Sequence, residues 1–296
     1  MIPMDGPDWS QEGRDWPNRE FSSFVTAAGL RWHVQRMGSG PVLLLVHGTG
    51  AATHSWRDLA PLLSRWFTVV APDLPGHGFT AAPSVSRLSL PGMARALDGL
   101  LKALGVTPSL VVGHSAGAAI LARMALDGMI APRAIISLNG AFLPFREEQG
   151  RFFSTLAKLL VLNPFVPRLF AWRAADRHSV ERLIAGTGSA LGGPGVDYYT
   201  RVLRYPRHVA AALGMMANWD LVPLVRDLPR LKCRLVLVAG SADHAVPPHQ
   251  AERIAARVPE SSLETLPKLG HLAHEERPDL VADIILRVAR QTGVIR

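Results

Sequence analysis

The sequence holds a single cysteine, Cys233, among 296 residues. One cysteine cannot form an intramolecular disulfide, so a chain of this length has to be stabilised by its hydrophobic core. A lone thiol also excludes a cysteine-rich zinc site and an iron–sulfur cluster, because both need several thiolates. The histidines lie apart, without the spacing of a metal motif. We therefore expect no metal and no cofactor, and a protein of the reducing cytoplasm.

The sequence also lacks a long apolar run. Its most apolar stretch, Phe152 to Phe170, is interrupted by charged residues, an asparagine and two prolines, so a membrane-spanning helix is not expected. The first residues are partly acidic and show no apolar segment of a signal peptide. Basic residues outnumber acidic ones by 32 to 24, but they are scattered rather than clustered with aromatic residues. This distribution argues against a nucleic-acid partner and leaves an anionic small molecule or an anionic membrane surface open.

A regular alternation of strand and helix patterns is what the sequence does contain. Val42–Val46 is a continuous apolar run, as in a strand buried on both faces. Leu90–Leu104 carries apolar residues at helical spacing and ends at Gly105. Such alternation predicts an α/β fold with a mostly parallel sheet and helices on both faces. Further strands are predicted at 67–71, 110–112, 134–138, 235–238 and 262–266, helices at 54–65, 116–126, 247–258 and 278–292, and a hairpin at 24–36 that turns at 28–29.

The alternation stops between residues 143 and 220, where helical patches, prolines and glycines follow one another. We predict an inserted helical lid there, between a first core part (1–142) and a second core part (221–296). Residues 1–20 form a polar arm, which Trp9 and Trp16 are expected to pack onto the body. Candidate catalytic residues lie on both sides of the insertion, so one sheet core with a lid is expected.

The most informative motif is Gly113-His114-Ser115-Ala116-Gly117, between a buried strand and a helix of small residues. In this setting G-x-S-x-G is a nucleophile elbow, a tight turn that exposes the serine hydroxyl at the edge of the sheet. Gly113 and Gly117 leave room for the turn. We therefore identify Ser115 as the candidate nucleophile.

A serine nucleophile needs a base, and the base needs an orienting carboxylate. On this type of sheet the chain order is serine, acid, histidine. Asp243 follows the strand at 235–238, and His271 lies near the end of the next strand. His271 would take the proton of Ser115, and Asp243 would hold the imidazole. After the strand at 134–138 the chain offers Asn139, which is neutral and cannot replace the acid.

Other histidines are less suited to be the base. His114, inside the elbow, should point away from the site. His244 and His274 lie near the proposed acid and base but follow no strand end, so surface or supporting roles are expected.

An oxyanion hole needs two backbone N–H groups near the nucleophile. Ala116, directly after the serine, supplies one, and Thr49 in His47-Gly48-Thr49-Gly50 is the predicted second donor. Gly48 and Gly50 let the backbone approach a substrate closely, and His47 is expected to hydrogen-bond within this loop. The segment from Asp73 to Gly78 consists of turn residues and is expected to support the site without reacting.

These segments together resemble the α/β-hydrolase family over about residues 21–296. The resemblance rests on the H-G-x-G loop at 47–50, the D-x-x-G-x-G loop at 73–78, the elbow, the G-x-x-D loop at 240–243, and Gly270, His271, Glu276 and Pro278. It implies the α/β-hydrolase fold with its lid. Phe79 stands where many relatives have serine, which should affect packing only. Serine at the elbow argues against the dehalogenase and epoxide-hydrolase branches, which use a carboxylate nucleophile.

A second resemblance is to the magnesium-chelatase accessory proteins of bacteriochlorophyll biosynthesis. It is carried by the segments 15–19, 29–35, 47–57 and 73–80. It implies a role near magnesium insertion into protoporphyrin, or in a neighbouring pigment step, and contact with a chelatase subunit.

The predicted lid holds nine arginines, one lysine and six acidic residues. Its net charge of +4 is therefore half of the net charge of +8 of the whole chain. Together with many aromatic residues, these arginines would suit a large apolar anionic ligand such as a porphyrin. The more favoured interpretation is that the aromatic residues pack the lid and the arginines are solvated. A third interpretation is peripheral membrane contact through the lid.

We therefore predict a serine hydrolase that acts on an ester or related acyl bond of a small-molecule substrate through an acyl-enzyme at Ser115. The alternative is a non-catalytic porphyrin-binding or chelatase-accessory protein that keeps the hydrolase fold. Cleavage of a carbon–carbon bond beside a ketone, which some serine relatives perform, is a further option.

Overall fold

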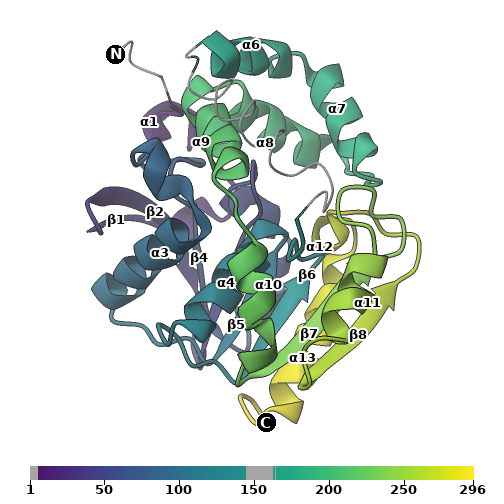
Figure 1. The fold of residues 1–296 in the computed structure, drawn as a ribbon. Coiled ribbons are helices and arrows are strands. Elements are labelled where there is room, and N and C mark those ends of the chain that lie inside the picture. Colours follow the sequence, from purple (N-terminus) through teal and green to yellow (C-terminus); the bar gives the residue numbers. More distant parts are fainter. Residues whose placement is uncertain (1–5, 145–162, 164) are drawn as a thin grey trace.

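A computed structural model describes residues 6–144, 163 and 165–296 (Figure 1). Its centre is an eight-stranded sheet in the order β1-β2-β4-β3-β5-β6-β7-β8. The pairs β1–β2 and β2–β4 are antiparallel, and all the others are parallel. The strands are β1 (Ser22–Ala27), β2 (Leu30–Met37), β3 (Val42–Val46), β4 (Thr68–Pro72), β5 (Leu110–His114), β6 (Ala134–Leu138), β7 (Arg234–Gly240) and β8 (Ser261–Leu266).

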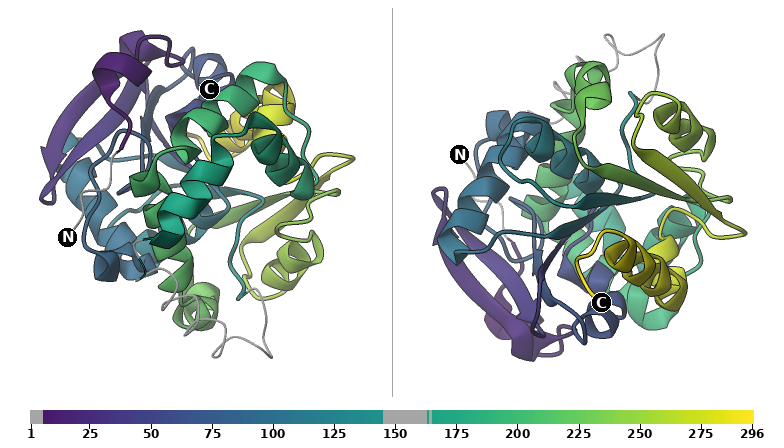
Figure 2. Two further views of the ribbon diagram at one scale, coloured as in Figure 1. Left: turned by 90° about the horizontal axis from the view of Figure 1, so that it is seen from above. Right: turned by 90° about the horizontal axis from the view of Figure 1, so that it is seen from below.

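Helices cover both faces of this sheet, as Figure 2 shows. The α-helices are α1 (Trp9–Glu12), α2 (Leu59–Leu63), α3 (Leu90–Leu104), α4 (Ala116–Leu126), α6 (Phe165–Ala174), α7 (Arg177–Gly186), α8 (Gly193–Leu203), α9 (Pro206–Ala217), α10 (Val222–Asp227), α11 (His249–Ala255), α12 (Ala273–Glu276) and α13 (Pro278–Gln291). Short 3-10 helices lie at Arg19–Phe21, Thr53–Trp56, Val85–Leu88 and Leu228–Arg230.

Alternate residues of the strands contribute side chains to two separate hydrophobic cores, one on each face of the sheet. In β3, Leu44 and Val46 join the core beneath α3 and α4, whereas Leu43 and Leu45 join the one beneath α2 and α13. Both sets are fully buried. A strand buried on both faces has no polar alternation, which explains its continuous apolar run. The predicted mostly parallel sheet with helices on both faces is confirmed.

Helix α3 has the predicted ends. Ser89 caps its start, where the hydroxyl accepts a hydrogen bond from the N–H of Gly92, and Gly105 ends it in the left-handed conformation (φ 62°). The predicted helix over 54–65 is wrong in extent, because the chain forms a 3-10 turn and then the short α2. Pro61 has no N–H to bond to the carbonyl of Arg57, so one continuous helix cannot form. The N–H of Thr53 bonds instead to Asp73 Oδ1 at 2.7 Å.

The N-terminal arm packs onto the body through its two tryptophans, as predicted. Trp16 is 2% exposed, and its indole N–H donates to Thr53 Oγ1 at 3.0 Å. The ring of Trp9 packs edge-on against Phe79, with ring centres 4.8 Å apart. Phe79, the residue that departs from the family pattern, therefore forms part of the surface on which the arm packs. The arm is less irregular than expected, since Asp8 caps the short helix α1.

Helices α6 to α9, which we call the lid, come between β6 and β7 in the chain and lie together beyond one end of the sheet (Figure 1). Among the described residues, no single helix has the length and apolarity to span a membrane. The bent pair of Pro206–Ala217 and Val222–Arg230 meets the length and composition criteria jointly.

Candidate active site

The candidate residues follow neighbouring strands at the carboxyl edge of the sheet. Ser115 comes directly after β5, Asn139 after β6 and Asp243 shortly after β7, while His271 lies beyond β8. These strands are adjacent and parallel, so their carboxyl ends meet at one edge, where ligand-facing groups gather in open α/β sheets.

Ser115 sits in a strained turn. Its backbone has φ 51° and ψ −117°, a region that side chains larger than glycine rarely adopt. The turn is held by its N–H, which donates to the carbonyl of Leu138 at 3.0 Å. A Cβ at Gly117 would collide with the carbonyl of Val46, and one at Gly113 would collide with the backbone of Ala118. Both glycines are therefore required by close backbone packing.

Asp243 and His271 form the predicted pair. The Nδ1–H of His271 donates to Asp243 Oδ2 at 2.8 Å, and both residues are buried. Asp243 Oδ1 accepts from the N–H groups of Ala245 and Val246, each at 2.8 Å. These donors leave the carboxylate little freedom to rotate. An imidazole held through Nδ1–H presents Nε2 as the free acceptor, which is the tautomer that a general base needs.

Asn139, set aside in the sequence analysis because it is neutral, takes part in this pair. Its amide Nδ2 donates to Asp243 Oδ2 at 2.7 Å and to the carbonyl of Gly270 at 3.3 Å. It thereby connects the loop after β6 to both the acid and the base loops. Its left-handed backbone (φ 49°) is tolerated because asparagine adopts this region more readily than other side chains. From the sequence, the neutral side chain of Asn139 ruled it out as the acid, but nothing indicated that it would hydrogen-bond to the acid Asp243.

Ser115 and His271 are close in the fold but not bonded. The ring of His114, next to Ser115, lies 4.7 Å from the ring of His271, and its Nε2–H donates to the carbonyl of His271 at 2.9 Å. No hydrogen bond among the described residues joins the Ser115 hydroxyl to His271. Such catalytic hydrogen bonds are often long without substrate and shorten in the complex.

Of the two other histidines near the pair, only His274 has a buried supporting position. His274 is buried and its Nε2 pairs with Ser55 Oγ at 2.8 Å, whereas the side chain of His244 is exposed. Burial, and then the neighbouring histidines, hold the pKa of His114 well below its ordinary value. Burial also lowers the pKa of His274 to about 3. Both rings are therefore neutral near pH 7.

The loop His47–Gly50 lies against the elbow. A Cβ at Gly48 would come within 2.9 Å of Ser115 Cβ, so only glycine fits there. Gly50 has φ 80°. Across residues 6–144, 163 and 165–296, no hydrogen bond occupies the N–H of Thr49 or that of Ala116, the first residue of α4. Both groups therefore remain available as donors, which is what an oxyanion hole requires.

The supporting loops behave as expected. His47 Nδ1–H donates to the carbonyl of Gly48 at 2.8 Å, and its Nε2 accepts from the N–H of Leu74 at 2.9 Å. Asp73 is fully buried and accepts from the N–H groups of Thr53 and Phe79 and from His33 Nδ1. Burial would raise the pKa of Asp73, but His33 and these hydrogen bonds hold it below its usual value. Asp73 is thus a structural anion that fastens three segments.

A second serine–histidine–aspartate chain exists in the same molecule. His33 Nδ1 bonds to Asp73 Oδ2 at 2.8 Å, and its Nε2 pairs with Ser22 Oγ at 3.0 Å. Ser22 begins the edge strand β1, far from any strand-to-helix elbow, and the ring of Trp9 covers His33. The hydrogen-bonded order alone therefore does not define a nucleophile. What distinguishes Ser115 is the elbow and the glycine loop beside it.

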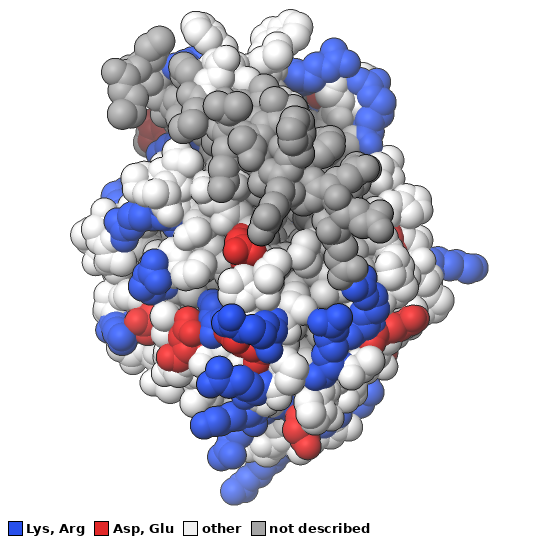
Figure 3. All heavy atoms as spheres, viewed as in Figure 1, with Lys and Arg blue, Asp and Glu red and all other residues white. Residues whose placement is uncertain are grey.

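Several lid arginines are paired with carboxylates of the protein itself. Arg201 forms a two-pronged ion pair with Asp15 of the arm at 2.6 and 2.9 Å. Glu12 of the arm pairs with Arg204, and Tyr205 donates to it at 2.7 Å. These contacts fasten the lid to the arm, so these two arginines are neither simply solvated nor free to bind an anionic ligand. Figure 3 shows basic and acidic side chains interspersed on the face below the lid.

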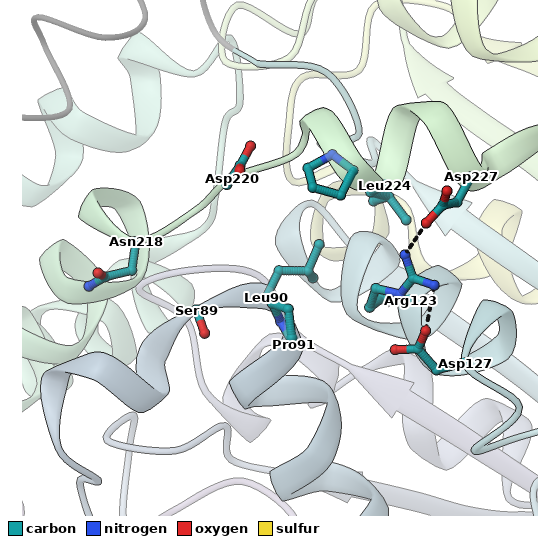
Figure 4. A pocket seen from close by; sticks show the side chains of 10 residues that line it. Ser89, Leu90, Pro91, Arg123, Asp127, Asn218, Asp220, Leu224 and Asp227 are labelled. Atoms are coloured by element: carbon teal, nitrogen blue, oxygen red, sulfur yellow. Dashed lines mark hydrogen bonds and ion pairs between the residues drawn. The ribbon is translucent and has the colours of Figure 1, made fainter.

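A pocket of about 380 Å³ lies between the start of α3, the end of α4 and α10 (Figure 4). Arg123 crosses it and bonds to Asp127 and Asp227. Ser115 is at the opposite end of α4, eight residues away, or roughly 12 Å along the helix axis. The pocket is therefore separate from the candidate site. Within the described part of the chain, no group of three or more His, Cys, Asp or Glu side chains could hold a metal ion.

Comparison with known proteins agrees with this architecture. Residues 43–284 match the Alpha/beta hydrolase family, and the chain belongs to that family. A relative from Rhodobacter capsulatus, the magnesium-chelatase 30 kDa subunit, is 39% identical over 274 residues, which cover 92% of this chain and 95% of that protein. The pyrrolizixenacetamide deacetylase of Xenorhabdus hominickii is 29% identical, covering 82% of this chain and 88% of that one.

A solved structure extends the likeness to the fold. The structure of the epoxide hydrolase CorEH matches this one with a TM-score of 0.78 and 21% sequence identity. The match covers 91% of this chain and 98% of the CorEH chain. At this identity the similarity concerns the fold alone. The α/β-hydrolase fold expected from the motifs is thereby confirmed, as is the resemblance to a magnesium-chelatase-associated protein.

Proposed function

We propose that this protein is a serine hydrolase that cleaves an ester or related acyl bond. The observation that carries the proposal is the buried Asp243–His271 pair beside a strained serine at a strand-to-helix elbow. The hydrolase family and the relative named as a deacetylase support an acyl bond as the target.

In the proposed reaction, His271 Nε2 removes the proton of Ser115 as its Oγ attacks the acyl carbon. The N–H groups of Thr49 and Ala116 stabilise the oxyanion. His271 then protonates the leaving group, and water releases the acyl group from Ser115 by the same steps in reverse roles. Asp243 keeps Nδ1 protonated and stabilises the imidazolium throughout, and Asn139 helps to hold Asp243.

Labelling with a fluorophosphonate probe tests this mechanism. The wild type should be labelled and Ser115→Ala should not. Ser22→Ala is the matched control, because Ser22 also contacts a histidine that bonds to an aspartate but has no elbow. It should be labelled like the wild type. Absence of labelling in folded wild type, or loss of labelling in Ser22→Ala alone, would contradict the assignment.

The biological role we propose lies near the magnesium-chelatase step of bacteriochlorophyll biosynthesis. Its support is the 39% identity to the magnesium-chelatase 30 kDa subunit of Rhodobacter capsulatus. The decisive measurement is the set of pigment precursors that accumulate in a strain lacking this protein, complemented with wild type or with Ser115→Ala. A catalytic role predicts that only the wild type restores the pigments.

The second candidate function is a non-catalytic one, a porphyrin-binding or chelatase-accessory protein that contacts a chelatase subunit. The same similarity favours it, because the relative is named as a chelatase subunit and not as a hydrolase. It predicts that Ser115→Ala restores pigment formation fully. Quenching of tryptophan fluorescence by protoporphyrin would then measure ligand binding directly, and the pairing of Arg201 and Arg204 with the arm makes these two arginines poor ligands for its propionates.

For localisation we propose a cytoplasmic protein with peripheral membrane contact through α6. Phe165, Leu169 and Trp172 on this helix are 68%, 61% and 71% exposed, an apolar surface that suits the interfacial layer of a bilayer. Wild type should sediment with vesicles containing anionic phosphatidylglycerol, and Leu169→Asp should not. Leu62→Asp, on the distant α2, is the control and should behave like wild type.

A further inference from the structure

The turn between α7 and α8, which we call the lid turn (Thr187–Ser189), lies directly on the acid and base loops. The carbonyl of Thr187 accepts from the N–H of His271 at 3.3 Å and from that of His244 at 3.1 Å. His244 follows the candidate acid Asp243 in the chain. One lid carbonyl therefore connects the two loops that carry the acid and the base.

The hydroxyl of Ser189 adds a second connection. It accepts a hydrogen bond from the N–H of Leu272, the residue after His271, at 2.8 Å. Ser189 is 5% exposed, so water cannot easily replace it. The two backbone N–H groups of the base loop, at 271 and 272, are thus both satisfied by the lid and not by the sheet.

The backbones also touch where no side chain fits. A Cβ at Gly188, whose φ is 82°, would collide with the carbonyl of Ala242 in the acid loop, and a Cβ at Gly270 would collide with the backbone of Gly188. Glu276 completes the contact, since its carboxylate accepts from the N–H of Gly270 at 2.9 Å and from that of Ala190 at 3.3 Å. Contacts this close require a fixed position of the lid turn relative to both loops.

We propose that the lid turn positions the acid–base pair, and that Ser189 is a positioning residue for His271. In this role the lid is a structural part of the site and not only its cover. The proposal builds on the proposed hydrolase function for its kinetic readout. Its structural claim, that the Asp243–His271 hydrogen bond depends on Ser189, can be tested whether or not the protein is a hydrolase.

The test compares Ser189→Ala with two controls. Ser189→Thr keeps the hydroxyl, and Asp176→Ala removes the cap of α7, where Asp176 accepts from the N–H groups of His178 and Ser179, without touching either loop. One readout is the rate constant at which a fluorophosphonate labels Ser115. The other, independent of activity, is the downfield NMR signal of the His271 Nδ1 proton in protein with ¹⁵N-labelled histidine.

We expect Ser189→Ala to lower the labelling rate about tenfold, because a small misplacement of a base has large effects, and to shift or broaden the His271 signal. Ser189→Thr and Asp176→Ala should stay within about twofold of wild type. If Ser189→Ala keeps both the rate and the signal, or if Asp176→Ala changes them equally, the proposal is overturned.

Two outcomes need separate treatment. A wild type that is never labelled contradicts the hydrolase function, and the NMR signal alone then decides the positioning role. If Ser189→Ala does not fold, Ser189→Cys replaces it. Its thiol is a weaker acceptor, so the same changes are expected at smaller size, and their absence overturns the proposal.

Discussion

His208 on α9 should make the stability of this protein depend on pH in a measurable way. The side chain is fully buried, its Nδ1 accepts from the N–H of Gly78 at 3.0 Å, and its Nε2–H donates to the carbonyl of Gly50 at 3.0 Å. The bond to Gly78 requires the neutral ring, because a proton on Nδ1 would face the N–H of Gly78. Burial, the largest influence, lowers the pKa of His208 to about 4.

The sign of the effect follows from the two pKa values. In the unfolded chain the pKa is about 6.5, so below that pH the unfolded state binds a proton that the folded state excludes. The contribution of His208 to the free energy of unfolding is therefore retained at pH 7. It falls by about 1.4 kcal/mol per pH unit between the two pKa values, which amounts to about 2 kcal/mol between pH 7 and pH 5.

Urea unfolding of the wild type and His208→Gln at pH 7, 6 and 5 measures this quantity. Glutamine offers one donor and one acceptor but does not titrate. The other buried histidines lower the stability of both proteins alike, so the difference between the two is informative. The stability advantage of the wild type should shrink by about 2 kcal/mol from pH 7 to pH 5. A difference in stability that stays constant from pH 7 to pH 5 would refute a buried neutral His208.

Three further predictions concern packing and the acid. Gly117→Ala should destabilise the fold by about 3 kcal/mol in urea unfolding, whereas Gly186→Ala, in a helical position with open space around it, should change stability by under about 1 kcal/mol. Trp16→Ala should lower stability by about 3 kcal/mol and expose the arm to limited proteolysis, read by mass spectrometry; an arm that stays protected would contradict the packing. Asn139→Ala should reduce the labelling rate of Ser115 by about tenfold, because a hydrogen bond to a charged group is lost, and an unchanged rate would argue against a role for Asn139 in holding Asp243.

Patterns that depend on one element were predictable from the sequence. The predicted bounds of Val42–Val46 and Leu90–Leu104 match the observed ones. Burial on both faces of a strand, or on one side of a helix, produces a pattern of apolar residues that is visible in the sequence. The Asp243–His271 contact also followed from chain order at adjacent strand ends. The helix expected at 54–65 is interrupted because Pro61 lacks an N–H, which the sequence does show, whereas no local pattern encodes the bond from the N–H of Thr53 to Asp73, twenty residues away.

The roles of Asn139 and Ser189 could not be predicted for the same reason. Each side chain bonds to a loop more than 80 positions further along the chain, and both residue types are common in turns, where they need no partner. Only the positive φ of Asn139 marks it as unusual, and backbone angles are not visible in a sequence. The partners of the lid arginines were equally hidden, since the sequence allowed solvated arginines or an anionic ligand, and Arg201 and Arg204 instead pair with Asp15 and Glu12 of the arm.

The contacts of the lid turn bear on attempts to change the substrate range by exchanging lids between relatives. A transplant that replaces the whole insertion would also replace Thr187, Gly188 and Ser189, and with them the hydrogen-bond acceptors of the loop that carries His271. The new lid would bring its own geometry to both loops. Chimeras should therefore keep these three residues native and join the foreign helices on either side of them.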